Sequence, residues 1–157
     1  SIKPMLTVLK NQLDKIDHKL HKLIESCDEY KIKNDIIQSI PGVGKVVAFN
    51  LISEMPELGY INNKEAASLV GVAPFNRESG SYKGKRMIRG GRSQIRTAMY
   101  IAMMSAIQCN PTFKTMYQRL VTAGKPKKVA IIACIRKLVI TLNSMVRDGV
   151  YWAPKMN

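Results

Sequence analysis

Residues 36–52 read IIQSIPGVGKVVAFNLI, in which a turn of proline and glycine separates two apolar segments. This pattern predicts a helix-hairpin-helix over residues 36–55, because proline and glycine end one helix and glycine permits the positive φ angles of a tight turn. Gly42 and Gly44 would leave backbone N–H groups open where the second helix starts, and the helix dipole there favours a phosphate. Lys45 would add positive charge. The alternative is a plain corner between two helices, in which the glycines only shape the turn.

The segment before this hairpin carries apolar residues in alternating steps of three and four, which is typical of a coiled-coil seam. The seam consists of Leu6, Leu9, Leu13, Ile16, Leu20, Leu23, Cys27 and Tyr30. Charged residues of both signs lie between these positions, so we expect a long helix over residues 1–33 that joins copies of the chain into a dimer or tetramer. The alternative is an amphipathic helix that packs on its own domain.

The remainder of the chain predicts a mainly all-α domain over residues 34–150. Beyond the hairpin we expect helices over residues 64–70, 92–108, 111–121 and from a turn at 124–128 to about 147. The glycine-rich, basic segment 74–92 interrupts the helical pattern and predicts an irregular loop or a short β-hairpin. Residues 151–157 are expected to be a tail that docks on a neighbour.

The charge of the chain points to a polyanionic partner. There are 25 Lys and Arg residues against 11 Asp and Glu residues, which gives a formal net charge of +14. This excess favours binding to the backbone of nucleic acid, most directly DNA, over a ribosome-like structural role, a membrane-surface role or simple solubility. The candidate nucleic-acid-binding residues are Gly42, Gly44, Lys45, Arg77, Lys83, Lys85, Arg86, Arg89, Arg92, Arg96, Lys125, Lys127 and Lys128.

Two classes of site are not expected in this chain. No apolar run approaches the roughly 20 residues that cross a bilayer, and no signal peptide is recognisable, so we expect a cytoplasmic protein that binds no membrane. His18 and His21 lie on a charged helix face without a cysteine nearby, and the three cysteines are widely spaced. These spacings do not match metal-ligand patterns, so the sequence predicts no metal site.

The basic segment 74–92 contains Ser79 directly before Gly80, with Arg77 and several further cations around it. A serine can attack a phosphodiester when cations stabilise the charge of the transition state and a base removes its proton. The cations are present, but no histidine and no cluster of carboxylates lies near Ser79 in the sequence. From residue type and context alone, Ser79 is better described as an ordinary loop serine beside a turn glycine.

Several short motifs occur in a specific order along the chain. They are Ile40-Pro41-Gly42-Val43-Gly44, Ala67 to Pro74, Ser79-Gly80, Gly90-Gly91-Arg92 with Arg96, Asn110-Pro111, Gly124-Lys125-Pro126 and Arg136-Lys137-Leu138. From about Ile37 to Asp148 this series resembles the C-terminal domain of the DEDD-type insertion-sequence transposases. That family includes the bridge-RNA-guided recombinases and the Piv invertases, and the seam helix resembles its coiled-coil linker.

The resemblance implies a bacterial DNA transposase in which the catalytic serine lies at the Ser-Gly pair of the basic segment. This position corresponds to Ser79, with Ser81 as the second candidate. The resemblance further implies a covalent phosphoserine intermediate, a structured guide RNA, and an N-terminal RuvC-like domain whose four acidic residues bind Mg²⁺. That domain is absent here, so this chain is expected to bind nucleic acid without cutting it and to need no cofactor of its own. The alternative is a non-enzymatic helix-hairpin-helix module that only binds nucleic acid.

Overall fold

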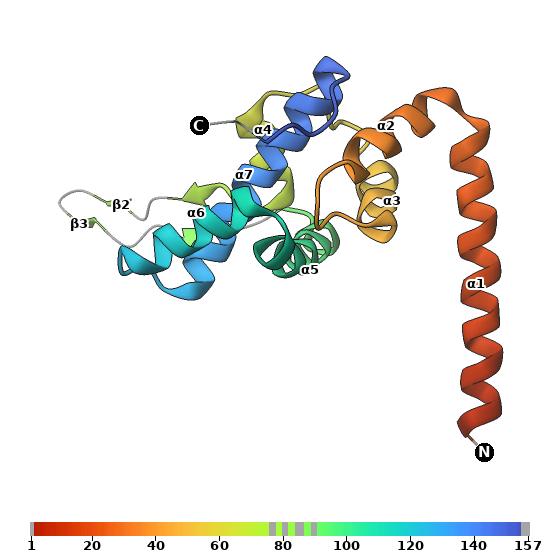
Figure 1. The fold of residues 1–157 in the computed structure, drawn as a ribbon. Coiled ribbons are helices and arrows are strands. Elements are labelled where there is room, and N and C mark those ends of the chain that lie inside the picture. The colour runs from red at the N-terminus through yellow and green to blue at the C-terminus, as the bar shows by residue number, and fades with distance from the viewer. Residues whose placement is uncertain (1, 76–77, 80–81, 84–86, 89–90, 155–157) are drawn as a thin grey trace.

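The computed structural model describes residues 2–75, 78–79, 82–83, 87–88 and 91–154. Over these residues the chain is mainly helical, which confirms the predicted fold class (Figure 1). The helices are α1 (Ile2–Ser26), α2 (Asp28–Gln38), α3 (Lys45–Glu54), α4 (Asn63–Val70), α5 (Ser93–Cys109), α6 (Pro111–Thr122) and α7 (Lys127–Asp148). Short strands lie between α4 and α5, namely β1 (Pro74–Phe75), β2 (Glu78–Ser79), β3 (Tyr82–Lys83) and β4 (Met87–Ile88).

Helix α7 forms the centre of the core. It contacts α2, α4, α5 and α6, and its residues Ile135, Leu138 and Leu142 are fully buried. By length and composition α7 is apolar enough to cross a membrane, contrary to the expectation that the chain has no such stretch. Because helices of the same chain pack around α7, its role as a core helix accounts for this hydropathy.

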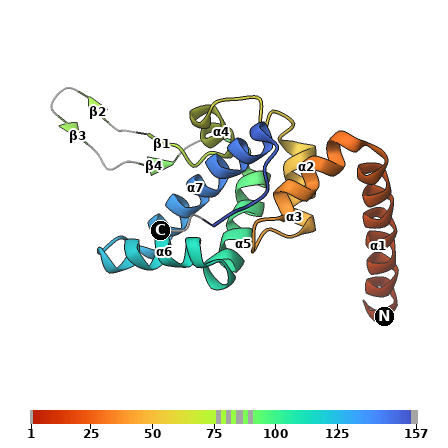
Figure 2. The same cartoon turned by 45° about the horizontal axis from the view of Figure 1, so that its top comes forward.

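Helix α1 extends away from the helical body in both views (Figures 1 and 2). Its seam residues Leu6, Leu9 and Leu13 are 57%, 51% and 61% exposed, and Ile24 in its last turn is buried. The alternative of a seam packed on its own domain is therefore wrong for these three leucines. Pairing of the seam with a second copy stays a prediction.

The long helix expected over residues 1–33 is divided at Cys27, which has an extended backbone with φ −109° and ψ 111°. Helix α2 begins at Asp28, whose acidic side chain in the first turn favours a new helix N-terminus. The change of direction brings α2 back to the body, where Ile36 and Ile37 are buried. A straight continuation of α1 would have carried these residues away from the core, so burial of the α2 face explains why the seam does not continue to Tyr30.

The four strands form a hairpin with two paired regions. β1 pairs with β4, and β2 pairs with β3 so that Ser79 lies opposite Tyr82 and Glu78 opposite Lys83. The β2–β3 pair lies farther from the helices than the β1–β4 pair, on the side of the body away from α1 (Figures 1 and 2). For residues 74–92 an irregular loop or a short β-hairpin was expected, and the described strands form a hairpin.

The C-terminal segment docks on its own chain. The backbone N–H of Trp152 donates a hydrogen bond to Oγ of Ser39, at 2.9 Å. Its indole ring stacks on Phe113 of α6, with ring centroids 6.0 Å apart and an interplanar angle of 21°. The neighbours of the expected tail at Trp152 are therefore α6 and Ser39 of the same chain, which supply an aromatic partner and a hydrogen-bond acceptor.

Candidate nucleic-acid interface

Positive charge is concentrated in one part of the chain. Residues 1–78 contain ten basic and ten acidic residues, whereas residues 79–147 contain fourteen basic and no acidic residues. The whole net charge of +14 therefore resides in the second segment. This basic half comprises the outer part of the hairpin together with α5, α6 and α7, and such one-sided charge is typical of nucleic-acid-binding surfaces.

The hairpin carries Ser79 away from the helices. Ser79 is the last residue of β2 and pairs with Tyr82, so it belongs to the outer of the two paired regions. Lys83 lies in β3, while Ser81 and four predicted cations lie outside the described residues. These cations are Arg77, Lys85, Arg86 and Arg89. The backbone thus places Ser79 and Lys83 together on a projecting ribbon with a basic sequence.

Two glycines join the base of the hairpin to α4. Gly71 ends α4 in a left-handed conformation with φ 79°, and Gly91 has the same φ of 79° at the end of the hairpin. A Cβ atom on Gly91 would overlap the backbone of Gly71, so only glycine allows the two chains to approach this closely. The N–H of Arg92 then donates to the carbonyl of Leu69 at 2.7 Å. The hairpin therefore starts and ends at one tightly packed point.

Arg92 was expected to bind nucleic acid, but the structure gives its guanidinium another role. It donates to both carboxylate oxygens of Glu57, at 2.6 and 2.9 Å, and to the carbonyl of Glu54 at 2.7 Å. These hydrogen bonds from Arg92 lower the pKa of Glu57 to about 2. On the same loop, the carbonyl of Pro56 accepts a bond of 3.4 Å from the buried Lys33, whose pKa is lowered chiefly by burial. Arg92 therefore fixes the hairpin base to the loop after α3.

The turn between α2 and α3 is fixed by α5 and α6. Gly42 has φ +98°, and a Cβ atom there would lie 2.6 Å from Cα of Ala106. Asn110 donates from Nδ2 to the carbonyl of Pro41 at 3.2 Å, and its Oδ1 accepts from Thr112 N–H at the start of α6. The predicted glycine turn is present, but Gly42 is needed for this packing.

Gly44 and Lys45 differ from Gly42 because they face solvent. A Cβ atom on Gly44 would meet nothing within 4 Å, and Lys45 is exposed. Gly44 is the N-cap of α3 and provides no side-chain cap, and the first turn of α3 contains no acidic residue. The first N–H groups of a helix have no partner within the helix, and here they lie at an exposed helix start beside Lys45, an arrangement that suits an anion. A groove beside it is lined by Asp17, Leu20, His21, Ile24, Asn34, Lys45, Val46 and Phe49.

The turn between α6 and α7 exposes the predicted Lys125, Lys127 and Lys128. Helix α6 has 12 residues, so this turn lies about 18 Å from Asn110 at the other end of α6. The lysine turn and the glycine turn held by Asn110 are consequently separate contacts and not one pocket. Arg96 lies in the first turns of α5 and is half-buried.

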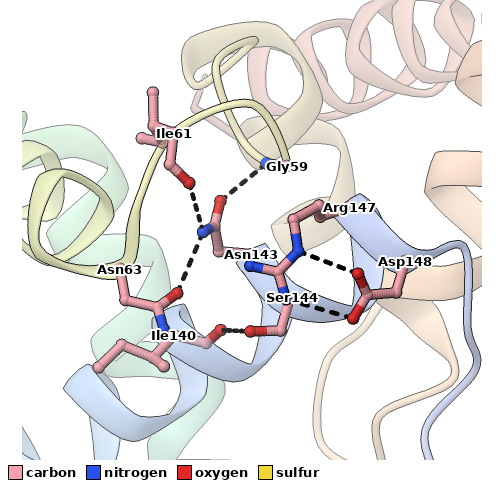
Figure 3. A network of polar contacts seen from close by, with 8 residues as sticks. All are labelled: Gly59, Ile61, Asn63, Ile140, Asn143, Ser144, Arg147 and Asp148. Atoms are coloured by element: carbon pink, nitrogen blue, oxygen red, sulfur yellow. Dashed lines mark hydrogen bonds and ion pairs between the residues drawn. The ribbon is translucent and has the colours of Figure 1, made fainter.

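Asn143 was missed by the sequence reasoning. It is fully buried on α7, where Oδ1 accepts from Gly59 N–H at 2.8 Å and Nδ2 donates to the carbonyl of Ile61 at 2.8 Å (Figure 3). Its Nδ2 also lies 3.2 Å from Oδ1 of Asn63. The available signal was a single amide within the apolar run Leu138 to Met145, since a buried polar side chain must find partners.

Metal-ligating side chains do not converge in the described part of the chain. Among residues 2–75 and 91–154 and the described strands, no group of three His, Cys, Asp or Glu residues could hold a metal ion. His18 is exposed and His21 is half-buried.

Known proteins have sequences similar to most of this chain. A family model described as "Transposase IS116/IS110/IS902 family" matches residues 34–118, which is more than half of the chain. The chain is 27% identical over 99% of its length to the insertion element IS110 uncharacterized 43.6 kDa protein of Streptomyces coelicolor, covering 38% of that relative. It is 28% identical over 88% of its length to the pilin gene-inverting protein of Moraxella lacunata, covering 44% of it. It is 30% identical over 76% of its length to the insertion element IS900 uncharacterized 42 kDa protein of Mycobacterium paratuberculosis, covering 31%.

The chain thus spans less than half the length of each of these relatives. The family match begins at Asn34, just before the α2–α3 turn, and includes the hairpin, the Gly91–Gly71 contact and Asn110. Its lower limit leaves α1 outside the matched region, while the alignment with the Streptomyces coelicolor relative extends over nearly the whole chain. On the strength of the family match, this chain belongs to the IS116/IS110/IS902 family of transposases.

Proposed function

We propose that this chain is the C-terminal part of a DNA transposase or recombinase, in which it binds DNA and presents Ser79 as the nucleophile for strand cleavage and exchange. The observation that carries the proposal is the position of Ser79 in the β2–β3 pair of a hairpin. This position lies in segment 79–147, which contains fourteen basic and no acidic residues. A projecting basic ribbon on a packed base is suited to entering a groove of DNA, because its cations meet phosphates while the helices stay outside.

In the proposed reaction, Oγ of Ser79 attacks the phosphorus of one DNA strand. A bond forms between Oγ and phosphorus, the bond to the 3′-oxygen breaks, and the strand end is held as a 5′-phosphoserine. The serine proton passes to a base, and the base in its protonated form gives a proton to the 3′-oxygen, which leaves as a hydroxyl. Segment 74–92 contains no histidine, and Glu78 is its one carboxylate, so we assign the base to another domain or protomer.

The Mg²⁺ implied by the resemblance does not fit the described residues, which bring no ligand cluster together. We assign it to a RuvC-like domain in the part of such a protein that this chain does not cover. The exposed seam of Leu6, Leu9 and Leu13 supports a homo-oligomer through α1, either a dimer or a tetramer. We further propose that the basic half also binds a structured guide RNA. The proposed location of the protein is the bacterial cytoplasm.

The test uses a transposase that contains both this chain and the upstream domain. Ser79→Ala is expected to abolish strand exchange and to leave DNA binding nearly unchanged, because a hydroxyl contributes little to phosphate affinity beside so many cations. Ser81→Ala is the matched control and is expected to keep its activity. A denaturant-resistant adduct between the protein and a nicked suicide substrate should form with the control and not with Ser79→Ala. Recombination by Ser79→Ala would refute the assignment.

A second candidate function is a helix-hairpin-helix module that binds nucleic acid without chemistry. It is favoured by one observation, the uncapped start of α3 at the open Gly44 with Lys45 beside it. This candidate makes Ser79 incidental. It predicts no covalent adduct with the unsubstituted protein, and DNA binding that is lost with Lys45→Glu.

A further inference from the structure

The outward face of α6 carries basic and uncharged polar side chains together. Its exposed residues are Pro111, Thr112, Lys114, Thr115, Gln118, Arg119 and Thr122. At 3.6 residues per turn they fall within an arc of about 160° on the helix. Phe113, Met116 and Leu120 on the opposite side pack against the core. The helix is therefore held in place by its apolar side and presents the other side to solvent.

This face is unusual because no acidic residue accompanies its cations. Exposed helices commonly alternate charges of opposite sign three or four residues apart, as α1 does with Lys10 and Asp14. Helix α6 contains no Asp or Glu, and the ion pairs found in the described residues join Arg92 to Glu57 and Arg147 to Asp148. The charges of Lys114 and Arg119 are consequently not neutralised by a carboxylate of the described residues.

The positive surface continues into the turn after α6. Lys125 N–H donates to the carbonyl of Leu120 at 3.1 Å, so the turn follows closely on the last turn of α6. Helix α7 then begins without a side-chain cap and without an acidic residue, and Lys127 and Lys128 occupy its first turn. The positive charges of these lysines are repelled by the positive end of the helix dipole and by each other. A bound anion would reduce both repulsions.

We propose that the outward face of α6 and the turn after it form one continuous surface for the backbone of duplex DNA. This α6 surface is defined as Lys114, Gln118, Arg119, Lys125, Lys127 and Lys128. The inference rests on the proposed function and extends it, because it adds a contact that is separate from the hairpin. Duplex DNA carries one charge per about 1.7 Å of axis, so the roughly 18 Å of α6 spans enough phosphates for these five cations.

Two features favour a duplex over a single strand. Proteins that bind single strands stack the bases on exposed aromatic rings, and the α6 surface contains no aromatic side chain. Furthermore, the α6–α7 turn and the β2–β3 pair both lie on the side of the body away from α1 (Figures 1 and 2). A rigid duplex along the α6 surface would thus run on the side from which the hairpin projects.

The test measures binding of the full chain to a short duplex DNA by fluorescence anisotropy over a range of salt concentrations. Replacement of Lys114 and Arg119 by glutamine is expected to lower the slope of log affinity against log salt by about 1.8, because two phosphate contacts are lost. Gln118→Glu keeps the size of the side chain and places a negative charge between the cations, and it is expected to weaken binding at least tenfold. Both changes are at exposed positions, and circular dichroism checks that the helices are retained.

The matched controls lie on α1, in the half with no net charge. Lys10→Gln with Lys22→Gln removes the same charge, and Gln12→Glu adds the same charge, at exposed positions. Neither control is expected to change the slope. Equal effects of the α6 and α1 variants, or no effect of the α6 variants, would overturn the α6 surface but not the proposed function. Loss of affinity for duplex RNA alone would also overturn it, while failure of the unsubstituted chain to bind DNA would overturn the proposed function itself.

Discussion

The neutral half, residues 1–78, and the basic half, residues 79–147, differ at the N-termini of four helices, α2 and α4 on the one side and α5 and α7 on the other. In the neutral half, α2 begins with Asp28 and Glu29, and α4 begins with a capping box formed by Asn62 and Glu65. In the basic half, neither α5 nor α7 has an acidic residue in its first turn or a side-chain cap. There are two exceptions, because α6 in the basic half is capped by Asn110 and α3 in the neutral half has neither a side-chain cap nor an acidic residue in its first turn. The first arrangement stabilises helices in the free protein, whereas the second leaves N–H groups and cations for an anionic partner.

The two halves are not separate units, because specific contacts fix one on the other. Gly42 packs on Ala106, Gly71 on Gly91, Glu57 pairs with Arg92 and Asn143 binds the loop after α3. Each contact joins a residue of the neutral half to a residue of the basic half. The charged surface is therefore held in position by close packing at glycines, by the Glu57–Arg92 ion pair and by the hydrogen bonds of the buried Asn143.

The contact between Gly42 and Ala106 should be the most sensitive to substitution. Gly42→Ala places a Cβ atom 2.6 Å from a backbone atom of α5 at a φ of +98°, so the turn and the helix must separate. We expect a loss of about 4 kcal/mol in the free energy of unfolding, from strain at a positive φ together with overpacking. Urea denaturation followed by circular dichroism measures this loss.

The control for that substitution is available in the same turn. Gly44 has open space around its Cβ position and a negative φ of −89°. Gly44→Ala should cost about 1 kcal/mol or less, because it affects only the N-cap of α3. Equal destabilisation by the two variants would show that the contact with Ala106 does not hold the halves together.

Replacement of Asn143 should cause the second-largest loss in the free energy of unfolding. Asn143→Ala leaves the N–H of Gly59 and the carbonyl of Ile61 without their side-chain partner at a fully buried position. We expect a loss of about 3 kcal/mol, since each unsatisfied buried group costs about 1 to 3 kcal/mol. In amide hydrogen exchange, Asn143→Ala should increase the exchange rate of the Gly59 N–H more than that of the Ala102 N–H in α5. Asn11→Ala on exposed α1 is the comparison variant, and a similar loss there would contradict this ranking.

The Glu57–Arg92 pair should have the smallest effect, and one that depends on pH. Because the pKa of Glu57 is lowered from 4.5 to about 2, its stabilisation is complete above about 4.5 and is lost as the pH falls through about 2. Both side chains are more than a third exposed, so we expect about 1 kcal/mol or less. Glu57→Gln should lower stability at pH 6 and make little difference at pH 2. A variant that is equally destabilised at both pH values would show that charge is not the cause.

Local features of the fold were predictable because they depend on neighbouring residues. Pro41 to Gly44 placed the α2–α3 turn correctly, and the spacing of apolar residues placed α5 and α6 within one or two residues. The glycine-rich, basic composition of residues 74–92 indicated an irregular loop or a short β-hairpin. For the candidate site, Gly44, Lys45 and the lysine turn are exposed as expected, while Ser79 remains a prediction for its chemistry.

Other features followed only from contacts between distant residues. From the sequence, Arg92 was predicted to be a cation that binds nucleic acid. In the fold, its guanidinium nitrogen lies 2.6 Å from a carboxylate oxygen of Glu57, because α3 and α5 pack together. Gly42 was predicted from the sequence to bind phosphate, which stays a prediction, and the close approach of Ala106 is a second reason for glycine at this position. Periodicity, turn residues and charge are properties of short segments, so they can be predicted from the sequence. The partner of each polar group and the space around each glycine depend on helix packing, which no short segment contains.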